Sequence, residues 1–310
     1  MVESRRVEQT LIFLHIQKTG GTTLHRIVER HYPPEANYFL DSWQFTLGRF
    51  INMSDDDRAK IRMLRGHMVF GMHQYLPNSS TYFTVLRDPV GRVISYYYHV
   101  RRDPKHHWHD FVVSKDLDLK AFLESGKDIG MTDFQTRVLA GGRWHDSAYG
   151  QCPQEALWVA KRHLRDHFAV VGLVERFDET LLLLKDVFGW QDLFYVRRNV
   201  TQKHPRRDGL SSDTLAAIVE ANQIDLQLYQ YVTTSFERQV RRQGPAFTAR
   251  VKSFQWLNRL LGPLPYGDQE VWWGSFHWFA RKWTRRILLS ITAIQAVSAV
   301  AMTRAYTLGG

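Results

Sequence analysis

Residues 11–24 read LIFLHIQKTGGTTL, and this stretch decides the fold. An apolar, β-prone run ends at Gln17 and Lys18. Two glycines, two hydroxyl residues and a helical pattern from Leu24 follow it. The order predicts a strand, a tight loop and a helix. Such a turn directs a helix N-terminus, several backbone N–H groups and the lysine at one place, which favours phosphate binding.

The order of residues inside this loop separates it from the common nucleotide-binding loop. The Walker A motif, G-x-x-x-x-G-K-[ST], places its lysine after the glycines. Here Lys18 comes before Gly20 and Gly21, and no glycine stands four residues before Gly20. The chain therefore lacks an ordinary ATP- or GTP-binding loop. Taken alone, these residues also fit a glycine-rich turn before any α/β helix.

A second segment, residues 81–99, reads TYFTVLRDPVGRVISYYYH. It predicts a strand that ends at Arg87 and a helix that begins near Pro89, because proline fits the first helical turn. Arg87 then lies at a strand end, and Ser95 lies on the helix. A guanidinium fork and a hydroxyl are suitable ligands for a phosphate dianion. Arg-Asp-Pro alone is also typical of a capped helix start, so the pairing with Ser95 and the Lys18 loop carries the prediction.

Together the two segments resemble the sulfotransferase family, with the closest likeness to the heparan sulfate 2-O- and 6-O-sulfotransferase branch and its bacterial relatives. Residues 15–24 resemble its 5′-phosphosulfate loop, and the pair of Arg87 and Ser95 resembles its 3′-phosphate motif. The resemblance implies a P-loop-like sulfotransferase fold that binds 3′-phosphoadenosine 5′-phosphosulfate (PAPS) without a metal. The residues that it assigns to PAPS in these segments are Lys18, Thr19, Gly20, Gly21, Thr22, Thr23, Arg87 and Ser95.

Two histidines between these segments are candidates for a general base. Residues 63–73 read MLRGHMVFGMH, and imidazole is the usual base at neutral pH for a hydroxyl that attacks sulfur. His67 resembles the histidine of the 2-O branch, and His73 resembles that of the 6-O branch. The sequence does not decide between them. We favour His67 as the base, with Lys18 stabilising charge and His73 near the acceptor. The simpler alternative for each ring is a structural histidine bonded to the backbone.

Two further segments resemble parts of the same family. Residues 133–141, DFQTRVLAG, resemble a helical segment whose expected acceptor contacts are Gln135 and Arg137. An ordinary polar helix surface is the alternative. Residues 199–207, NVTQKHPRR, resemble a loop that closes over the nucleotide, and a solvated basic loop is the alternative there. The contacts expected from this loop are Thr201, Lys203 and Arg206.

Apolar runs alternate with helical patterns as far as Tyr231. This alternation predicts an α/β fold with a central, mostly parallel sheet flanked by helices. A late buried strand begins at Phe168, and a short strand is expected over Phe194–Arg198. One amphipathic helix is expected over Ser211–Tyr231. We assign residues 1–240, which the resemblance covers, to a PAPS-dependent sulfotransferase domain.

Residues 241–310 differ in composition and predict a basic, aromatic-rich helical extension. Residues 245–310 hold eight basic and two acidic residues, a net charge of +6. The uncharged run 287–303 would span about 26 Å as a helix, less than the ~30 Å core of a membrane. Two interpretations stay open: contact with a membrane surface through residues 271–303, or packing and dimerisation.

The composition bears on location and partners. The single cysteine, Cys152, excludes an intrachain disulfide. The net charge of +10 suits an anionic cofactor and an acidic glycan, a glycolipid or an anionic lipid surface. No recognised nucleic-acid motif accompanies that charge. The N-terminus shows no basic-then-apolar signal sequence. We therefore expect a cytoplasmic protein, peripheral on the inner face of the membrane if the extension binds lipid, unlike the Golgi-anchored animal relatives.

The resulting hypothesis is sulfuryl transfer from PAPS to a hydroxyl of a carbohydrate or glycoconjugate, by in-line displacement with a histidine base. A nucleotide-dependent kinase is one alternative, but it needs the Walker order and a magnesium carboxylate. A non-enzymatic, basic glycan- or membrane-binding protein is the other, and it needs no combination of Lys18, Arg87, Ser95 and a histidine. The acceptor, the sulfated position and the oligomeric state stay open.

Overall fold

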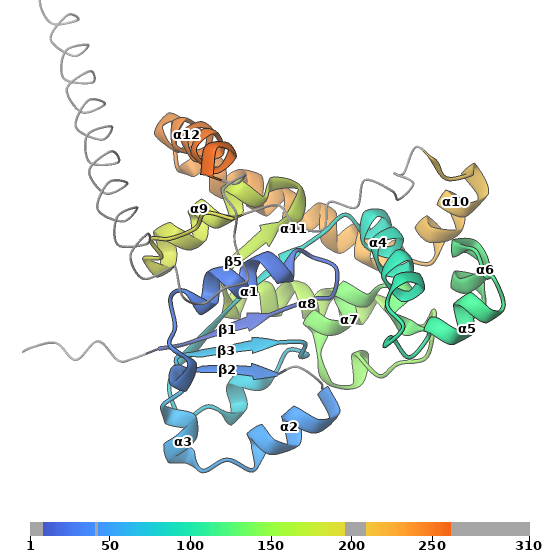
Figure 1. Ribbon diagram of the computed structural model, residues 1–310, viewed down its shortest axis with the longest axis horizontal. Helices are drawn as coiled ribbons and strands as arrows, with labels where there is room; N and C mark the ends of the chain where they lie inside the picture. Colours follow the sequence, from blue (N-terminus) through green and yellow to red (C-terminus); the bar gives the residue numbers. More distant parts are fainter. Residues whose placement is uncertain (1–8, 41–42, 196–208, 262–310) are drawn as a thin grey trace, which may run out of the picture. The chain divides into compact units, whose positions relative to one another are not determined.

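The computed structural model describes residues 9–40, 43–195 and 209–261 (Figure 1). Three of the predictions lie outside these residues, wholly or in large part. They are the nucleotide-closing contacts Thr201, Lys203 and Arg206, most of the short strand Phe194–Arg198, and the extension beyond residue 261 with its membrane-contact segment 271–303.

Five parallel strands form one sheet in the order β2-β3-β1-β4-β5. The strands are β1 Thr10–Leu14, β2 Asn37–Leu40, β3 Met63–Gly66, β4 Ser80–Leu86 and β5 Phe168–Leu173. The predicted α/β fold with a parallel central sheet is therefore confirmed.

The central strand, β1, is apolar because it lies inside the core. All five of its residues are buried, which is typical of a strand covered on both faces. Phe13 stacks on Phe83 of the neighbouring strand, with 4.8 Å between the ring centroids. The one hydroxyl of β1, on Thr10, donates to the carbonyl of Ile61 at 2.7 Å. The strand thus buries no unsatisfied side-chain polar group.

Helices flank the sheet and surround its carboxyl edge. In Figure 1, α4, α5, α6 and α10 gather on the side toward which the strand arrows point. The helices are α1 Gly21–Glu29, α2 Trp43–Ile51, α3 Asp55–Ala59, α4 Pro89–Arg102, α5 His109–Ser114, α6 Leu119–Glu124, α7 Phe134–Ala140, α8 Gln154–His167, α9 Phe177–Phe188, α10 Ser212–Glu220, α11 Gln223–Arg242 and α12 Pro245–Leu261.

The strand order creates a topological switch point at the carboxyl ends of β1 and β4. The chain leaves β1 toward the β2 edge and leaves β4 toward the opposite, β5 edge. Ligands bind at such a switch point in open α/β sheets. The Lys18 loop follows β1, Arg87 follows β4, and His67 follows β3, the other neighbour of β1. Three segments that the sequence singled out therefore meet at one edge of the sheet.

The predicted helix Ser211–Tyr231 is two helices, α10 and α11, that meet at Asn222. The buried side chain of Asn222 donates to the carbonyls of Met131 and Ile218 and accepts from the backbone N–H of Asp133. An asparagine that bonds the main chain in this way competes with continuation of a helix. Amphipathic periodicity alone did not reveal this break.

The compact unit continues past the predicted boundary at residue 240. Phe247, Val251 and Phe254 of α12 are buried in the same core as the strands. The unit that contains the sheet accordingly runs to Pro263. Within the described ranges, no helix has both the length and the apolar character that a membrane crossing requires.

Candidate functional site

Residues 18–23, the end of the connection after β1 and the first turn of α1, form the Lys18 loop. Lys18 and Gly20 have φ angles of 69° and 82°, in the left-handed region where glycine is favoured. The buried Thr19 hydroxyl donates to the carbonyl of Ile16 at 2.7 Å and closes the turn. Thr19 therefore directs its side chain into the protein, and only its backbone is left for a ligand.

The N-terminus of α1 has free donors. The helix begins after Gly20, and no side chain caps it. In the described residues, the Gly21 and Thr22 N–H groups make no hydrogen bond. Thr22 is exposed and Thr23 is half-buried in the same helical turn. Uncapped N–H groups at a helix N-terminus favour an anion.

A close approach makes Gly21 necessary. A Cβ placed on Gly21 would lie 1.9 Å from Nε2 of His15. The imidazole edge of His15 thus packs directly against the start of α1. Any side chain at position 21 would displace either the ring or the helix end. The second glycine of the loop is therefore explained by a packed histidine as well as by ligand access.

Lys18 and Arg87 form one positively charged site. Nη1 of Arg87 donates to the Lys18 carbonyl at 3.1 Å, which joins the two predicted phosphate segments. Burial, followed by the charges of Arg102 and Arg87, lowers the pKa of Lys18 to about 8. A bound anion would relieve this accumulation of charge. No group of three or more metal-ligating side chains is found in the part of the chain that the structure describes.

One face of α4 lies toward this site. A Cβ placed on Gly91 would be 3.5 Å from Nε of Arg87, so the guanidinium group lies over the first turn of α4. Ser95, His99 and Arg102 follow at helical spacing on one face. Burial and then the charge of Lys18 lower the pKa of His99 to about 4. Ser95 is half-buried on this face. His99 and Arg102 were not predicted as site residues, although their spacing from Ser95 indicates the shared face.

Gln135 supports Arg87 instead of contacting an acceptor. Its fully buried amide accepts from the Arg87 N–H at 3.0 Å and donates to the Arg87 carbonyl at 2.9 Å. Both of its polar atoms are therefore occupied. The structure corrects the prediction for Gln135 to a positioning role.

Arg137 is also fully buried and directed away from any ligand. Its guanidinium group donates to the carbonyls of Thr132, Ser147 and Ala148. These bonds tie α7 to the loop that follows it. Arg137 thus stabilises the fold instead of making the acceptor contact expected from the sequence. The reason is that Gln135 and Arg137 of α7 both face the protein interior.

His67 lies at the carboxyl end of β3, next to the strand that leads into the Lys18 loop. Its imidazole stacks on His15 with 4.6 Å between ring centroids. Burial and then the charge of Lys18 lower its pKa. Neither ring nitrogen of His67 has a hydrogen-bond partner in the described residues. The ring is therefore neutral at pH 7, close to Lys18 and free to accept a proton.

His73 lies at the other end of the sheet. Its backbone N–H donates to the Tyr82 hydroxyl at 2.9 Å, and its Nδ1 lies 2.9 Å from the same hydroxyl. Tyr82 is near the start of β4, and four residues of strand, about 13 Å, separate it from Leu86. The structure therefore does not bring His73 together with Lys18, and it corrects the predicted catalytic and acceptor roles.

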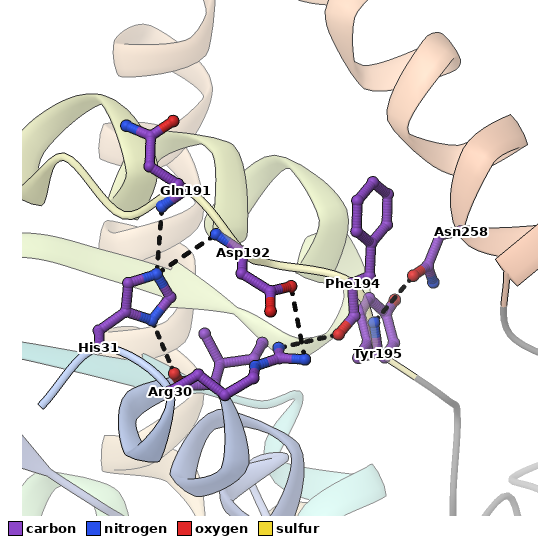
Figure 2. Close-up of polar contacts among 8 residues, drawn as sticks. Arg30, His31, Gln191, Asp192, Phe194, Tyr195 and Asn258 are labelled. Carbon is purple, nitrogen blue, oxygen red and sulfur yellow. Dashed lines mark hydrogen bonds and ion pairs between the residues drawn. The ribbon is translucent and has the colours of Figure 1, made fainter. Parts of the chain in front are cut away.

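The end of α1 holds the segment that precedes residues 196–208 (Figure 2). Arg30 pairs with Asp192 at 3.5 Å and donates to the carbonyl of Phe194 at 2.8 Å. The N–H of Tyr195 donates to Asn258 of α12 at 2.9 Å. The chain thus enters the region of the predicted nucleotide-closing loop from a point fixed on the helix that begins at the Lys18 loop.

A family model described as galactose-3-O-sulfotransferase matches residues 2–269. The chain belongs to the galactose-3-O-sulfotransferase family. Human galactose-3-O-sulfotransferase 3 is 26% identical over 272 residues, which are 79% of this chain and 60% of that protein. Chicken heparan-sulfate 6-O-sulfotransferase 1 is 27% identical over 274 residues, 72% of this chain and 65% of that protein. Human galactosylceramide sulfotransferase is 25% identical over 260 residues, 78% of this chain and 60% of that protein.

The chain spans 60–66% of the length of the first three curated relatives that it matches, all of them galactose-3-O-sulfotransferase 3 proteins. A solved structure of mouse sulfotransferase SULT7A1, complexed with adenosine 3′,5′-bisphosphate (PAP), is 14% identical to this chain. The two align with a TM-score of 0.33 over 60% of each chain.

The comparisons confirm the predicted sulfotransferase family and change two finer predictions. Galactose-3-O- and heparan-sulfate 6-O-sulfotransferases both match, so the heparan sulfate branch is not singled out. The expected cytoplasmic location is wrong. That expectation separated this chain from the animal sulfotransferases, and animal sulfotransferases are among the relatives that match it.

The structure predicts that Gln135→Leu destabilises the fold. It leaves the half-buried N–H and carbonyl of Arg87 without partners, at about 1 kcal/mol for each group, the low end of the range for such groups. The free energy of unfolding, measured by urea denaturation, is expected to fall accordingly. The control is Gln223→Leu, at an exposed position, with an expected change below ~0.5 kcal/mol. Equal losses of unfolding free energy in the two variants would contradict the positioning role of Gln135.

Proposed function

We propose that this chain transfers the sulfuryl group of PAPS to a hydroxyl of a carbohydrate or glycoconjugate. The observation that carries the proposal is the hydrogen bond between Arg87 and the Lys18 carbonyl, which joins two phosphate-binding segments at the switch point of the sheet. Membership of the galactose-3-O-sulfotransferase family supports the same activity.

The residues at this edge of the sheet suit a nucleotide that carries phosphate groups at the 3′ and 5′ positions of its ribose. The Lys18 loop supplies an ammonium group and uncapped N–H groups, as a 5′-phosphosulfate requires. Arg87 supplies a guanidinium fork and Ser95 a hydroxyl for a 3′-phosphate. When bound, PAPS would supply an activated sulfuryl group, with adenosine 3′,5′-bisphosphate (PAP) as the product.

The protein's own contribution is charge stabilisation and proton acceptance. Lys18 and the loop N–H groups stabilise negative charge that develops beside them, without reorganising during the reaction. His67 accepts the proton of the attacking hydroxyl at a free ring nitrogen, since burial and Lys18 keep that ring neutral. His15 at the end of β1 fixes His67 in place by stacking.

The acceptor class follows from the relatives' names. Galactose, galactosylceramide and heparan sulfate all offer sugar hydroxyls, and the matching family is named for the 3-hydroxyl of galactose. A glycan or glycolipid with terminal galactose is therefore the first acceptor class to test. The net charge of +10 also favours anionic acceptors.

The test of PAPS binding is calorimetric titration with PAP in the presence of EDTA. Wild-type protein is expected to bind PAP, and Arg87→Ala is expected to weaken binding at least tenfold, about 1.4 kcal/mol. Arg101→Ala on α4, where the arginine pairs with the exposed Asp116, is the matched control with unchanged affinity. Binding of ATP with magnesium, but not of PAP, would replace the proposal with a kinase.

The base is tested with His67→Ala. Turnover is expected to fall by ~10²–10⁴-fold, the usual contribution of a positioned base, with little change in PAP affinity. Sulfate transfer is measured under single-turnover conditions, alongside His73→Ala. A larger loss of turnover in His73→Ala than in His67→Ala would reverse the assignment.

The affinity for PAP is also expected to depend on pH. Lys18 has a pKa of about 8 in the free protein, and a bound phosphate raises it by favouring the protonated amine. Affinity should therefore be constant below pH 8 and fall as the pH rises above it, up to tenfold per unit. Lys18→Arg remains charged throughout this range and should remove the decline. A wild-type affinity that is unchanged up to pH 9.5 would contradict this account.

A further inference from the structure

A chain of four polar side chains runs behind the Lys18 loop from the protein surface to His15. Glu29 accepts from Nη2 of Arg65 at 2.8 Å. Nη1 of Arg65 lies 3.0 Å from Nδ1 of His25, and Nε2 of His25 lies 3.1 Å from Nδ1 of His15. Asn37 accepts from Nε of Arg65 at 2.8 Å and fixes the guanidinium plane. The four groups come from α1, β3 and the end of β1.

The arginine sets the direction of every hydrogen bond in this chain. A guanidinium group has donors and no acceptor, so Nδ1 of His25 must accept. The proton of the neutral His25 ring is then on Nε2, which donates to Nδ1 of His15. The proton of His15 is in turn on Nε2. The polarity thus fixes both tautomers as Nε2–H, an assignment that coordinates without hydrogens leave open.

The Nε2–H group of His15 faces the Lys18 loop. This nitrogen is the atom closest to a Cβ placed on Gly21, the first residue of α1. In the described ranges, this nitrogen makes no hydrogen bond. The neighbouring N–H groups of Gly21 and Thr22 also lack acceptors. Three N–H donors without hydrogen bonds in the described residues therefore lie at the start of α1.

The surroundings of the two rings keep them neutral. Burial is the first cause that lowers the pKa of His15, and the nearby charges of His67, His25 and Lys18 add to it. Burial and then the charge of Arg65 lower the pKa of His25 to about 3. A neutral ring keeps one lone pair for the preceding donor, so the chain is not interrupted by protonation at physiological pH.

We propose that His15 is an additional hydrogen-bond donor to the anionic group held at the Lys18 loop, and that Arg65 and His25 are positioning residues that fix its proton on Nε2. This inference rests on the proposed function. It extends the loop from a lysine and backbone groups to a directed imidazole N–H. No proton is transferred, because His15 donates its hydrogen bond as a neutral ring.

The tautomers are read directly from two-bond ¹H–¹⁵N spectra of protein labelled with ¹⁵N-histidine, without any turnover. His15 and His25 are expected as Nε2–H. His31 is an internal reference of opposite polarity (Figure 2): its Nε2 accepts from the N–H groups of Gln191 and Asp192, so its proton is on Nδ1. Addition of PAP is expected to shift the Nε2–H resonance of His15 and to leave the His31 signals unchanged.

The outcomes separate this inference from the proposed function. A His15 proton on Nδ1 overturns the inference whatever binds at the loop. PAP binding that calorimetry detects, with no change at Nε2 of His15, also overturns it and leaves the proposed function standing. Failure of PAP to bind, with both tautomers as expected, overturns the proposed function and the contact that rests on it.

Two variants test the positioning residues. His25→Phe retains a ring beside Phe13 and Phe39 but breaks the link to His15, so a mixture of His15 tautomers is expected. Arg65→Lys keeps a cationic donor beside His25 and should retain the Nε2–H form. The His31 signals report whether each variant is folded. Pure Nε2–H in His25→Phe would show that the relay does not set the proton of His15. With PAPS as donor, His25→Phe is expected to lower kcat more than it raises KM. His15→Phe is expected to lower kcat by about 10²-fold.

Discussion

The hydrogen bond from Arg87 to the Lys18 carbonyl is the contact on which the site depends. It joins the ends of β1 and β4, two strands whose connections diverge, and it holds two cations close together. Burial lowers the pKa of both side chains, and the charges of Arg102 and Arg87 lower that of Lys18 further, so a bound anion would stabilise the protonated lysine. The free helix end at Gly20 adds partial positive charge to the same place.

Buried polar groups of α7 and α11 maintain that geometry. Gln135 holds the backbone of Arg87, and Asp225 accepts from the N–H groups of Gln135 and Thr136. Asp133 accepts from the N–H of Asp225 at 2.8 Å, while burial and the charge of Asp225 raise the pKa of Asp133 to about 7. The site is thus fixed from behind by satisfied hydrogen bonds, which are costly to break in a buried environment.

The sequence was sufficient to predict the local parts of the site but not the direction in which distant side chains point. The strand, loop and helix around Lys18 and the capped helix after Arg87 follow from short-range rules, and both are confirmed. The different positions of His67 and His73 depend on the path of the chain, because one follows β3 and the other lies beside the start of β4. Gln135 has the residue type of a ligand contact, but only tertiary packing shows that its partner is Arg87.

The central claim is that this edge of the sheet transfers a sulfuryl group, and radiolabel transfer tests it most directly. The protein is incubated with ³⁵S-labelled PAPS, EDTA and an acceptor with terminal galactose, and labelled product and PAP are quantified together. The account predicts metal-independent formation of labelled sugar and PAP in equal amounts, abolished by Lys18→Met. Persistence of transfer in Lys18→Met at the wild-type rate would contradict it.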